Sequence, residues 1–238
     1  MRRTLPLLLI ALLAGCTSVS AAAPAAPPAV TPSSTPTVVT LGDSVPAGTA
    51  CACEPFPDLY AQAQHAVSRN LAVAGATSAD VLSRVQSAPP DLDDADEVIL
   101  MIGANDVAAA FDNDTSYDDA ASTVRTNVIS AITAIEHAHQ VPVVVLGYWN
   151  VVRDGQVGIA QYGADGMKAA VSATASANDA LEDAARSTGA TYVPTRVAFH
   201  GADEKTDATA LLAADGDHPN ALGHAKIAAL LPPLTPSR

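Results

Sequence analysis

The sequence predicts an α/β protein with three layers, in which helices cover both faces of a parallel sheet. Short apolar runs alternate along the chain with longer segments of helical periodicity. The apolar runs do not alternate with polar residues, which is typical of parallel strands buried on both faces. The composition, 49% hydrophobic and 16% charged, suits a well-buried globular domain.

Five segments are expected to be strands. The first, 37–41, is apolar and β-branched and stops at Gly42-Asp43-Ser44. The others are 70–73, 98–102, 142–146 and 191–193. Five parallel strands separated by helices fit a doubly wound, flavodoxin-like sheet, whose ligands bind beyond the carboxyl ends of the strands.

Helical spacing of apolar residues connects these strands. The clearest case is 117–140, in which Val124, Val128, Ile132 and Ile135 recur on one face. The other predicted helices are 55–68, a segment that begins at Ser78 and ends before Pro89, 165–188, and a last helix that Pro219 can start.

The N-terminus is typical of an export signal. Arg2 and Arg3 precede a short apolar stretch, and Leu13-Ala14-Gly15-Cys16 then resembles a bacterial lipobox, in which Cys16 receives the lipid. The alternative is an ordinary secretory signal in which Cys16 is incidental. We therefore expect a signal peptide over 1–15 and a lipoprotein on the outer side of the bacterial cytoplasmic membrane or in the cell envelope.

Composition divides the rest of the chain. Residues 16–36 are rich in Ala, Pro, Ser and Thr and carry no charge, which indicates a tether. The folded domain is expected over 37–234, followed by a short tail, 235–238. The protein is expected to be a monomer.

The net charge of −13 limits the partners. The chain has no basic stripe, so nucleic acid is not an expected partner. Anionic lipid headgroups would repel so acidic a body, and contact with the membrane is therefore expected through the N-terminal lipid anchor only.

Residues able to carry chemistry follow three of the predicted strands. Ser44 follows the first strand, Gly75 the second and Asn105 the third. The carboxyl ends of parallel strands share one edge of the sheet, so these three residues should lie together. Asp215 and His218, three residues apart near the C-terminus, supply a carboxylate and an imidazole. An oriented histidine is the usual base that activates a serine nucleophile.

These residues form four ordered blocks that resemble the GDSL, or SGNH, hydrolase family of serine esterases and lipases. The blocks are Gly42-Asp43-Ser44, the glycine at Gly75, Gly103-Ala104-Asn105-Asp106, and Asp215-x-x-His218. The resemblance covers about residues 38–231, and Val45 replaces the leucine of the family name. That position carries no chemistry, so the departure does not weaken the resemblance.

The resemblance implies a catalytic mechanism for a carboxylic ester hydrolase. Ser44 would attack the ester and form an acyl-enzyme, with His218 as general base and acid and Asp215 orienting the imidazole. The oxyanion hole would consist of the Ser44 and Gly75 backbone N–H groups and the Asn105 side chain. No metal or organic cofactor is implied. Asp217 is a rival to Asp215, and Ser44 could instead be a helix N-cap.

The substrate class stays open in the sequence. An acylated glycan or an acyl lipid are both expected ester substrates. The alternatives to hydrolysis are an SGNH-type O-acyltransferase and a non-catalytic binding module of the cell envelope. Trp149, Asn150, Arg153 and Tyr162 follow the fourth predicted strand and could line the substrate pocket, or could simply pack within a loop.

Two further cysteines, Cys51 and Cys53, lie close after the nucleophile block. An exported protein permits a disulfide between them, although the ring would be small. Two free thiols are an equal alternative. A metal pair is less favoured, because no second pair of cysteines accompanies them.

Overall fold

The computed structural model describes residues 35–234. The predicted signal peptide, the lipidation site Cys16, nearly all of the tether and the C-terminal tail lie outside these residues. Within the described part of the chain, no helix is both long enough and apolar enough to cross a membrane.

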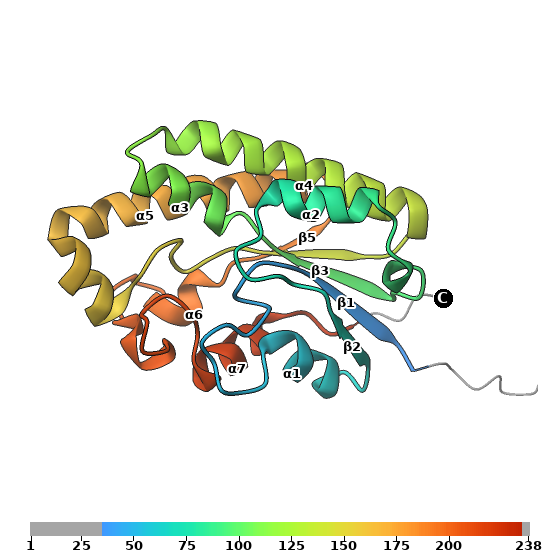
Figure 1. Ribbon diagram of the computed structural model, residues 1–238. Coiled ribbons are helices and arrows are strands. Elements are labelled where there is room, and N and C mark those ends of the chain that lie inside the picture. The colour runs from blue at the N-terminus through green and yellow to red at the C-terminus, as the bar shows by residue number, and fades with distance from the viewer. Residues whose placement is uncertain (1–34, 235–238) are drawn as a thin grey trace, which may run out of the picture. The chain divides into compact units, whose positions relative to one another are not determined.

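The predicted three-layer α/β/α fold is confirmed (Figure 1). All five strands are parallel and lie in the order β2-β1-β3-β4-β5, the flavodoxin-like order. The strands are β1 (Thr37–Gly42), β2 (Val67–Asn70), β3 (Glu97–Met101), β4 (Val143–Leu146) and β5 (Thr191–Val193).

Helices cover both faces of the sheet, as Figure 1 shows. One face carries α2 (Ser78–Gln86), α3 (Ala104–Asp112), α4 (Tyr117–His139) and α5 (Gly155–Thr188). The other carries α1 (Phe56–Ala63), α6 (Arg196–His200) and α7 (Ala221–Leu230). Two 3₁₀ turns complete the described part, η1 (Pro90–Leu92) and η2 (Ala208–Leu211).

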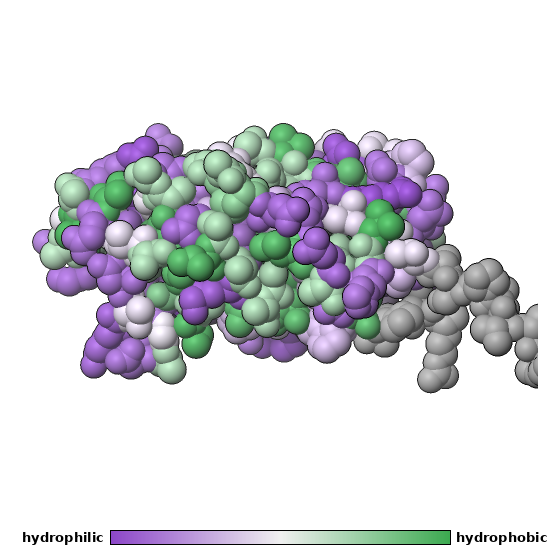
Figure 2. Space-filling view, turned by 90° about the horizontal axis from the view of Figure 1, so that it is seen from below, coloured by the Kyte–Doolittle hydropathy of each residue, from purple (hydrophilic) through white to green (hydrophobic). Residues whose placement is uncertain are grey.

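The core lies on both sides of the central strands. Every residue of β1, β3 and β4 is buried, so both faces of these strands are covered. The edge strand β2 is polar and partly exposed, and it lies three residues earlier in the chain than predicted. Seen from below in Figure 2, apolar residues on the surface lie in patches interrupted by hydrophilic ones.

Several helices differ from the prediction. Helix α1 ends at Ala63, five residues before the predicted end, and the short helix α6 was not predicted. The largest differences concern α5 and α3. Helix α5 begins at Gly155, ten residues before the predicted start, and Gly163 interrupts it with a positive φ of 65°. Helix α3 was not predicted at all. Both helices begin at the carboxyl edge of the sheet, where the predicted chemistry lies.

Candidate active site

Ser44 lies in a tight turn directly after β1. The backbone N–H of Thr49 donates to the Ser44 carbonyl, and the N–H of Ala47 donates to the Asp43 carbonyl. These bonds continue the chain as a turn rather than as a regular helix, so Ser44 is not the N-cap of a long helix. Ser44 lines a surface cavity.

Asp43 supports this turn from the buried side. Its Oδ1 accepts a hydrogen bond from the Val45 N–H at 3.0 Å, and its Oδ2 accepts one from the Tyr148 hydroxyl at 2.5 Å. Burial raises the pKa of Asp43 to about 6, although the bonds from Tyr148 and Val45 partly oppose the rise. The pKa of Tyr148 is also raised by burial and by the nearby carboxylate, which keeps its phenol a donor.

His218 and Asp215 lie together in the loop before α7. His218 Nδ1 donates to Asp215 Oδ2 at 2.7 Å, so Nε2 is the ring nitrogen that is left for a substrate or for Ser44. The other carboxylate oxygen of Asp215 accepts the backbone N–H groups of Asp217 and His218. Burial favours a higher pKa for Asp215, but these hydrogen bonds outweigh it and lower the pKa.

The loop that carries this pair is fixed at both ends. Leu212 and Pro219 form an antiparallel bridge, and the Ala213 N–H donates to the His218 carbonyl at 2.8 Å. Asn220 then caps α7 through the N–H groups of Leu222 and Gly223. His218 is therefore held directly before a capped helix, and the helix begins at Ala221 rather than at Pro219.

Ser44, Asn105 and His218 line one cavity of about 240 Å³. No hydrogen bond joins the Ser44 hydroxyl to His218 among residues 35–234, and such bonds are often long before substrate binds. The cavity thus brings together residues from β1, β3 and the C-terminal loop, which lie far apart in the sequence.

Asn105 occupies the first turn of α3, at the carboxyl end of β3. Its Nδ2 donates to the Ala76 carbonyl at 2.8 Å, which uses one of the two amide hydrogens and ties α3 to the Gly75 loop. The second amide hydrogen is available to the cavity that Asn105 lines.

Gly75 lies beside this bond but borders a different cavity, of about 380 Å³, that extends toward α2. A Cβ on Gly75 would meet no atom within 4 Å, so close approach is not the constraint. Its φ of +80° is the constraint, because this left-handed conformation costs other residues free energy.

Asp106 was assigned no role from the sequence, yet it connects two parts of the site. Its carboxylate accepts the Ser78 N–H at 2.9 Å and the Ser78 hydroxyl at 2.7 Å. Ser78 starts α2, just after the Gly75 loop. The Asn105 and Asp106 side chains therefore hold this loop against α3 from two positions.

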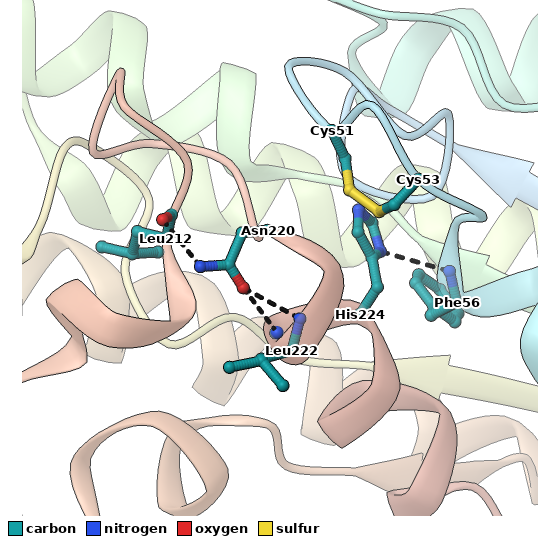
Figure 3. Close-up of a disulfide and its surroundings, with 8 residues drawn as sticks. Cys51, Cys53, Phe56, Leu212, Asn220, Leu222 and His224 are labelled. Carbon is teal, nitrogen blue, oxygen red and sulfur yellow. Dashed lines mark hydrogen bonds between the residues drawn. A yellow bond between two sulfur atoms is a disulfide. The ribbon is translucent and has the colours of Figure 1, made fainter.

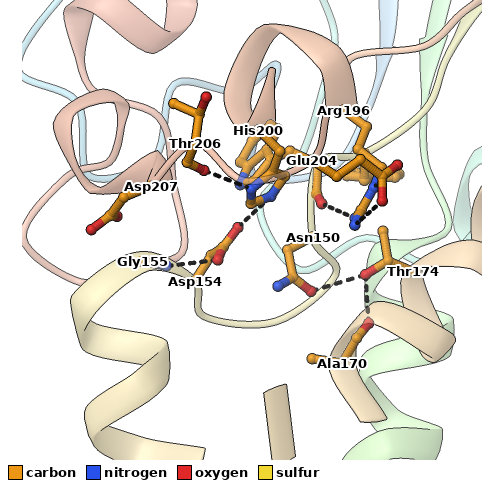
Figure 4. Close-up of polar contacts among 12 residues, drawn as sticks. Asn150, Asp154, Gly155, Ala170, Thr174, Arg196, His200, Glu204, Thr206 and Asp207 are labelled. Carbon is orange, nitrogen blue, oxygen red and sulfur yellow. Dashed lines mark hydrogen bonds and ion pairs between the residues drawn. The ribbon is translucent and has the colours of Figure 1, made fainter. Parts of the chain in front are cut away.

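Three of the four predicted pocket residues line the same cavity as Ser44, namely Asn150, Arg153 and Tyr162. Asn150 is buried and accepts a hydrogen bond from Thr174 at 2.9 Å, as Figure 4 shows. Arg153 donates to Gln161, and Tyr162 packs edge-on against Phe111.

Trp149 lies in the core instead of the pocket. It is 1% exposed and stacks on Phe199 with ring centroids 4.1 Å apart. Its carbonyl accepts a hydrogen bond from the Arg196 guanidinium at 3.1 Å. An aromatic side chain buried in this way anchors the pocket loop and does not reach a substrate.

A second histidine–carboxylate pair lies behind the pocket loop. His200 Nε2 is 2.9 Å from Asp154 Oδ2, and Asp154 also caps α5 through the Gly155 N–H (Figure 4). The hydrogen bond to Asp154 raises the pKa of His200 above its ordinary value, against the opposing effect of burial. The Asp154 N–H donates to the Gly216 carbonyl at 2.7 Å, which joins the pocket loop to the His218 loop.

The polar character of the cavity comes from the charged and amide side chains in its lining. The complete lining is Ser44, Val45, Ala104, Asn105, Ala108, Asp112, Tyr148, Asn150, Val151, Val152, Arg153, Gln161, Tyr162, Asp217 and His218. Asp217 belongs to this lining, whereas Asp215 is the partner of the His218 imidazole. Burial raises its pKa.

The structural comparisons agree with this architecture. No curated protein sequence matches the chain. Phospholipase A1 from Streptomyces albidoflavus NA297 is 22% identical, with a TM-score of 0.60 over 83% of this chain and 100% of that one. An extracellular lipase from Streptomyces rimosus is 20% identical, with a TM-score of 0.60 over 84% and 100%.

A third similar structure is a catalytic mutant of an acetylxylan esterase from Geobacillus stearothermophilus. It is 18% identical, with a TM-score of 0.61 over 82% of this chain and 91% of that one. Likeness at these identities establishes the shared fold. The family model of the GDSL-like lipase/acylhydrolase family matches residues 40–226, which is most of the chain and contains all four blocks. The chain belongs to the GDSL-like lipase/acylhydrolase family.

Proposed function

We propose that this protein is a serine hydrolase that cleaves carboxylic esters through an acyl-enzyme on Ser44. The observation that carries the proposal is the shared cavity of Ser44, Asn105 and His218, with Asp215 fixed on the far nitrogen of the imidazole. No metal or organic cofactor takes part in this mechanism.

In the first half-reaction, His218 Nε2 takes the Ser44 proton as the oxygen attacks the ester carbonyl. The imidazolium is stabilised by Asp215, whose lowered pKa keeps it ionised. His218 then gives the proton to the leaving alcohol. In the second half-reaction, water attacks the acyl-enzyme with His218 again acting as base, and Ser44 recovers its proton.

The oxyanion of both tetrahedral intermediates would accept hydrogen bonds from three donors. They are the Ser44 N–H, the Gly75 N–H and the remaining amide hydrogen of Asn105. The bond from Asn105 to the Ala76 carbonyl supports this assignment, because it holds the Gly75 loop beside the Asn105 amide.

The cavity favours a small acyl group on a polar alcohol, such as an acetylated or short-acyl glycan. Its volume of about 240 Å³ is below the usual range for ligand sites, roughly 300–1,000 Å³. The cavity is lined by side chains with hydrogen-bond donors and acceptors, which suit sugar hydroxyl groups: Asp112, Asn150, Arg153, Gln161 and Asp217.

A lipid ester is the second candidate, because a larger cavity of about 380 Å³ with several apolar lining residues lies beside Gly75. Leu41, Leu71, Val73 and Val81 contribute to its lining. It shares no lining residue with the Ser44 cavity, so an acyl chain would have to cross the loop to enter it. This separation makes the polar ester the better fit.

An ester panel tests the choice. Initial rates on acetylated sugars and on glycerol or phosphoglycerol esters of increasing acyl length are compared for the wild type and Ser44→Ala. The proposal predicts the highest kcat/KM on short-acyl sugars and no activity above background for the variant. Preference for long acyl chains would favour the second cavity, and full activity of Ser44→Ala would reject the mechanism. Acyl transfer to an added sugar alcohol, in place of hydrolysis, would identify an acyltransferase.

We also propose that the protein is exported, carries a lipid on Cys16 and acts as a monomer anchored at the outer side of the bacterial cytoplasmic membrane or in the cell envelope. The support is the sequence Leu13-Ala14-Gly15-Cys16 after a short apolar stretch. Mass spectrometry of the native N-terminus should find diacylglycerol on Cys16. An unmodified Cys16, or cleavage elsewhere, would contradict the proposal.

A further inference from the structure

In the structure, the loop after Ser44 contains a disulfide between Cys51 and Cys53. Both cysteines are partly exposed, and Ala52 between them is exposed. The fully buried His224 of α7 lies against them (Figure 3). A ring nitrogen of His224 and both sulfur atoms lie within 4.8 Å of one another.

The tautomer of His224 is fixed by the backbone. Its Nδ1 accepts the Phe56 N–H at 3.2 Å and therefore carries no proton. Burial lowers the pKa of His224 to about 4, so the ring is neutral at neutral pH. The one ring proton must then be on Nε2, which Figure 3 shows turned toward the disulfide. Nε2 is buried and has no hydrogen-bond partner among residues 35–234.

This fixed proton argues against a metal ion on the same three residues. Two cysteines and a histidine are common ligands of zinc, but a ligating nitrogen needs its lone pair free. Here the nitrogen that faces the sulfurs bears the proton, and moving the proton to Nδ1 would set it against the Phe56 N–H.

Stapling the fold is also a weak explanation of the disulfide. A cross-link stabilises mainly by restricting the unfolded chain, and its effect grows with the length of the closed loop. Cys51 and Cys53 are two positions apart, so the closed loop is very short and the expected stabilisation is small. The buried N–H without a partner lowers the stability of the oxidised form further.

We propose that Cys51–Cys53 is a thiol–disulfide exchange site, in which the His224 Nε2–H hydrogen-bonds the cysteine thiolate formed on reduction by a dithiol. Reduction supplies the buried N–H with an anionic acceptor, and such charge-assisted bonds are strong. The unpaired N–H destabilises the oxidised form and the new hydrogen bond stabilises the thiolate, so both effects favour the reduced form. The inference does not depend on the proposed ester hydrolysis.

The exchange follows the usual two steps. A thiolate of the external dithiol bonds to one cysteine sulfur, the Cys51–Cys53 bond breaks, and its electron pair leaves on the other cysteine. The second thiolate of the reagent then displaces the first cysteine. The dithiol becomes a disulfide, and the protein gains two electrons. One proton of the dithiol ends on a cysteine thiol, the other goes to solvent, and the second cysteine remains the thiolate beside His224.

The test equilibrates the folded full-length protein with dithiothreitol of graded oxidised-to-reduced ratio. Alkylation followed by mass spectrometry gives the reduced fraction of the Cys51–Cys53 peptide, so Cys16 does not interfere. His224→Asn keeps an acceptor for the Phe56 N–H but removes the Nε2–H. It should lower the equilibrium constant for reduction by about tenfold or more and raise the thiol pKa measured by thiolate absorbance.

His224→Gln is the matched control, because its amide keeps an N–H near the position of Nε2. It should stay closer to the wild type in both measurements, and circular dichroism establishes that each variant is folded. Equal equilibrium constants and thiol pKa values for the wild type and His224→Asn would overturn the proposal. So would a wild-type disulfide that stays oxidised in excess reduced dithiothreitol.

Discussion

The hydroxyl of Tyr148 donates a hydrogen bond of 2.5 Å to the buried carboxylate of Asp43, the residue directly before Ser44. The bond joins the loop after β4 to the turn after β1. Tyr148 also lines the cavity that contains Ser44, so one side chain contributes both to the position of the nucleophile turn and to the pocket wall.

Tyr148→Phe should shift the acid limb of the kcat/KM profile to higher pH, because the Asp43 carboxylate holds the Ser44 turn through the Val45 N–H. Without this donor, the Asp43 carboxylate stays buried but is less stabilised, so its pKa rises above about 6. The loss of a buried hydrogen bond to a charged group should also lower the free energy of unfolding by about 1–3 kcal/mol. The pH profile on one soluble ester, together with urea unfolding, measures both effects.

Tyr60→Phe is the control for this prediction. The Tyr60 hydroxyl donates to the Glu97 carboxylate at 2.8 Å, a similar buried pair at the opposite edge of the sheet. This variant should lose stability but keep the wild-type pH profile. Identical profiles for the two variants would show that the Tyr148–Asp43 bond has only a structural role.

Two buried groups, Asp43 and His224, should make the free energy of unfolding depend on pH in opposite directions. The raised pKa of Asp43 means that the folded state binds a proton more tightly, so its contribution to stability is present below pH 3.8 and is lost as the pH rises through about 6. The lowered pKa of His224 has the opposite effect, and its contribution is lost as the pH falls from 6.5 through about 4.

Asp43→Asn should therefore gain stability relative to the wild type as the pH rises from about 4 to 6. His224→Asn should gain stability relative to the wild type as the pH falls from 6.5 to about 4. Each change should be on the order of 2–3 kcal/mol across its window. Urea unfolding of the three proteins measures the differences, and a constant difference for either variant would contradict its assignment.

Asn105→Ala should lower kcat by about 10²–10³, because one oxyanion donor is lost. The variant also loses the bond to the Ala76 carbonyl, so some loss of stability is expected. Asn113→Ala removes a similar amide-to-backbone bond at the exposed end of α3 and serves as the control. If both variants kept the wild-type kcat, Asn105 would not belong to the oxyanion hole.

Gly75→Ala should reduce both stability and activity through its backbone. The left-handed conformation costs an alanine about 1–2 kcal/mol, and relaxation of φ would turn the N–H away from the oxyanion. Gly189→Ala is a matched control, with a φ of +86° and equally open space around its Cβ position at the end of α5. It should lose similar stability and no activity. If Gly75→Ala kept the same kcat as Gly189→Ala, the Gly75 N–H would not belong to the oxyanion hole.

The fold could be predicted from the sequence where strands are buried on both faces. The central strands β1, β3 and β4 are buried on both faces, so each appears in the sequence as a continuous apolar run. The edge strand β2 has the sequence Val-Ser-Arg-Asn and lacks this signal, and its predicted position was wrong by three residues. The start of α5 could not be predicted, because glycine is a poor helix former and the first part of this helix contains Gly155, Gly158 and Gly163.

The candidate site could be predicted where residues follow strand ends or lie close in sequence. Parallel topology brings Ser44 and Asn105 to one edge, and the three-residue spacing lets Asp215 reach His218. The sequence contains no comparable signal for Asp43 and Tyr148, which are 105 residues apart, or for Phe56 and His224, which are 168 apart. Such pairs depend on how the loops pack after the sheet has formed.

Covalent labelling tests the central claim most directly. The folded wild-type protein is treated with a fluorophosphonate, and the modified residue is identified by peptide mass spectrometry. We expect one adduct, on Ser44, that forms more slowly in Asp215→Asn and is absent in Ser44→Ala. A folded wild-type protein that stays unlabelled, or an adduct that persists in Ser44→Ala, would contradict the account.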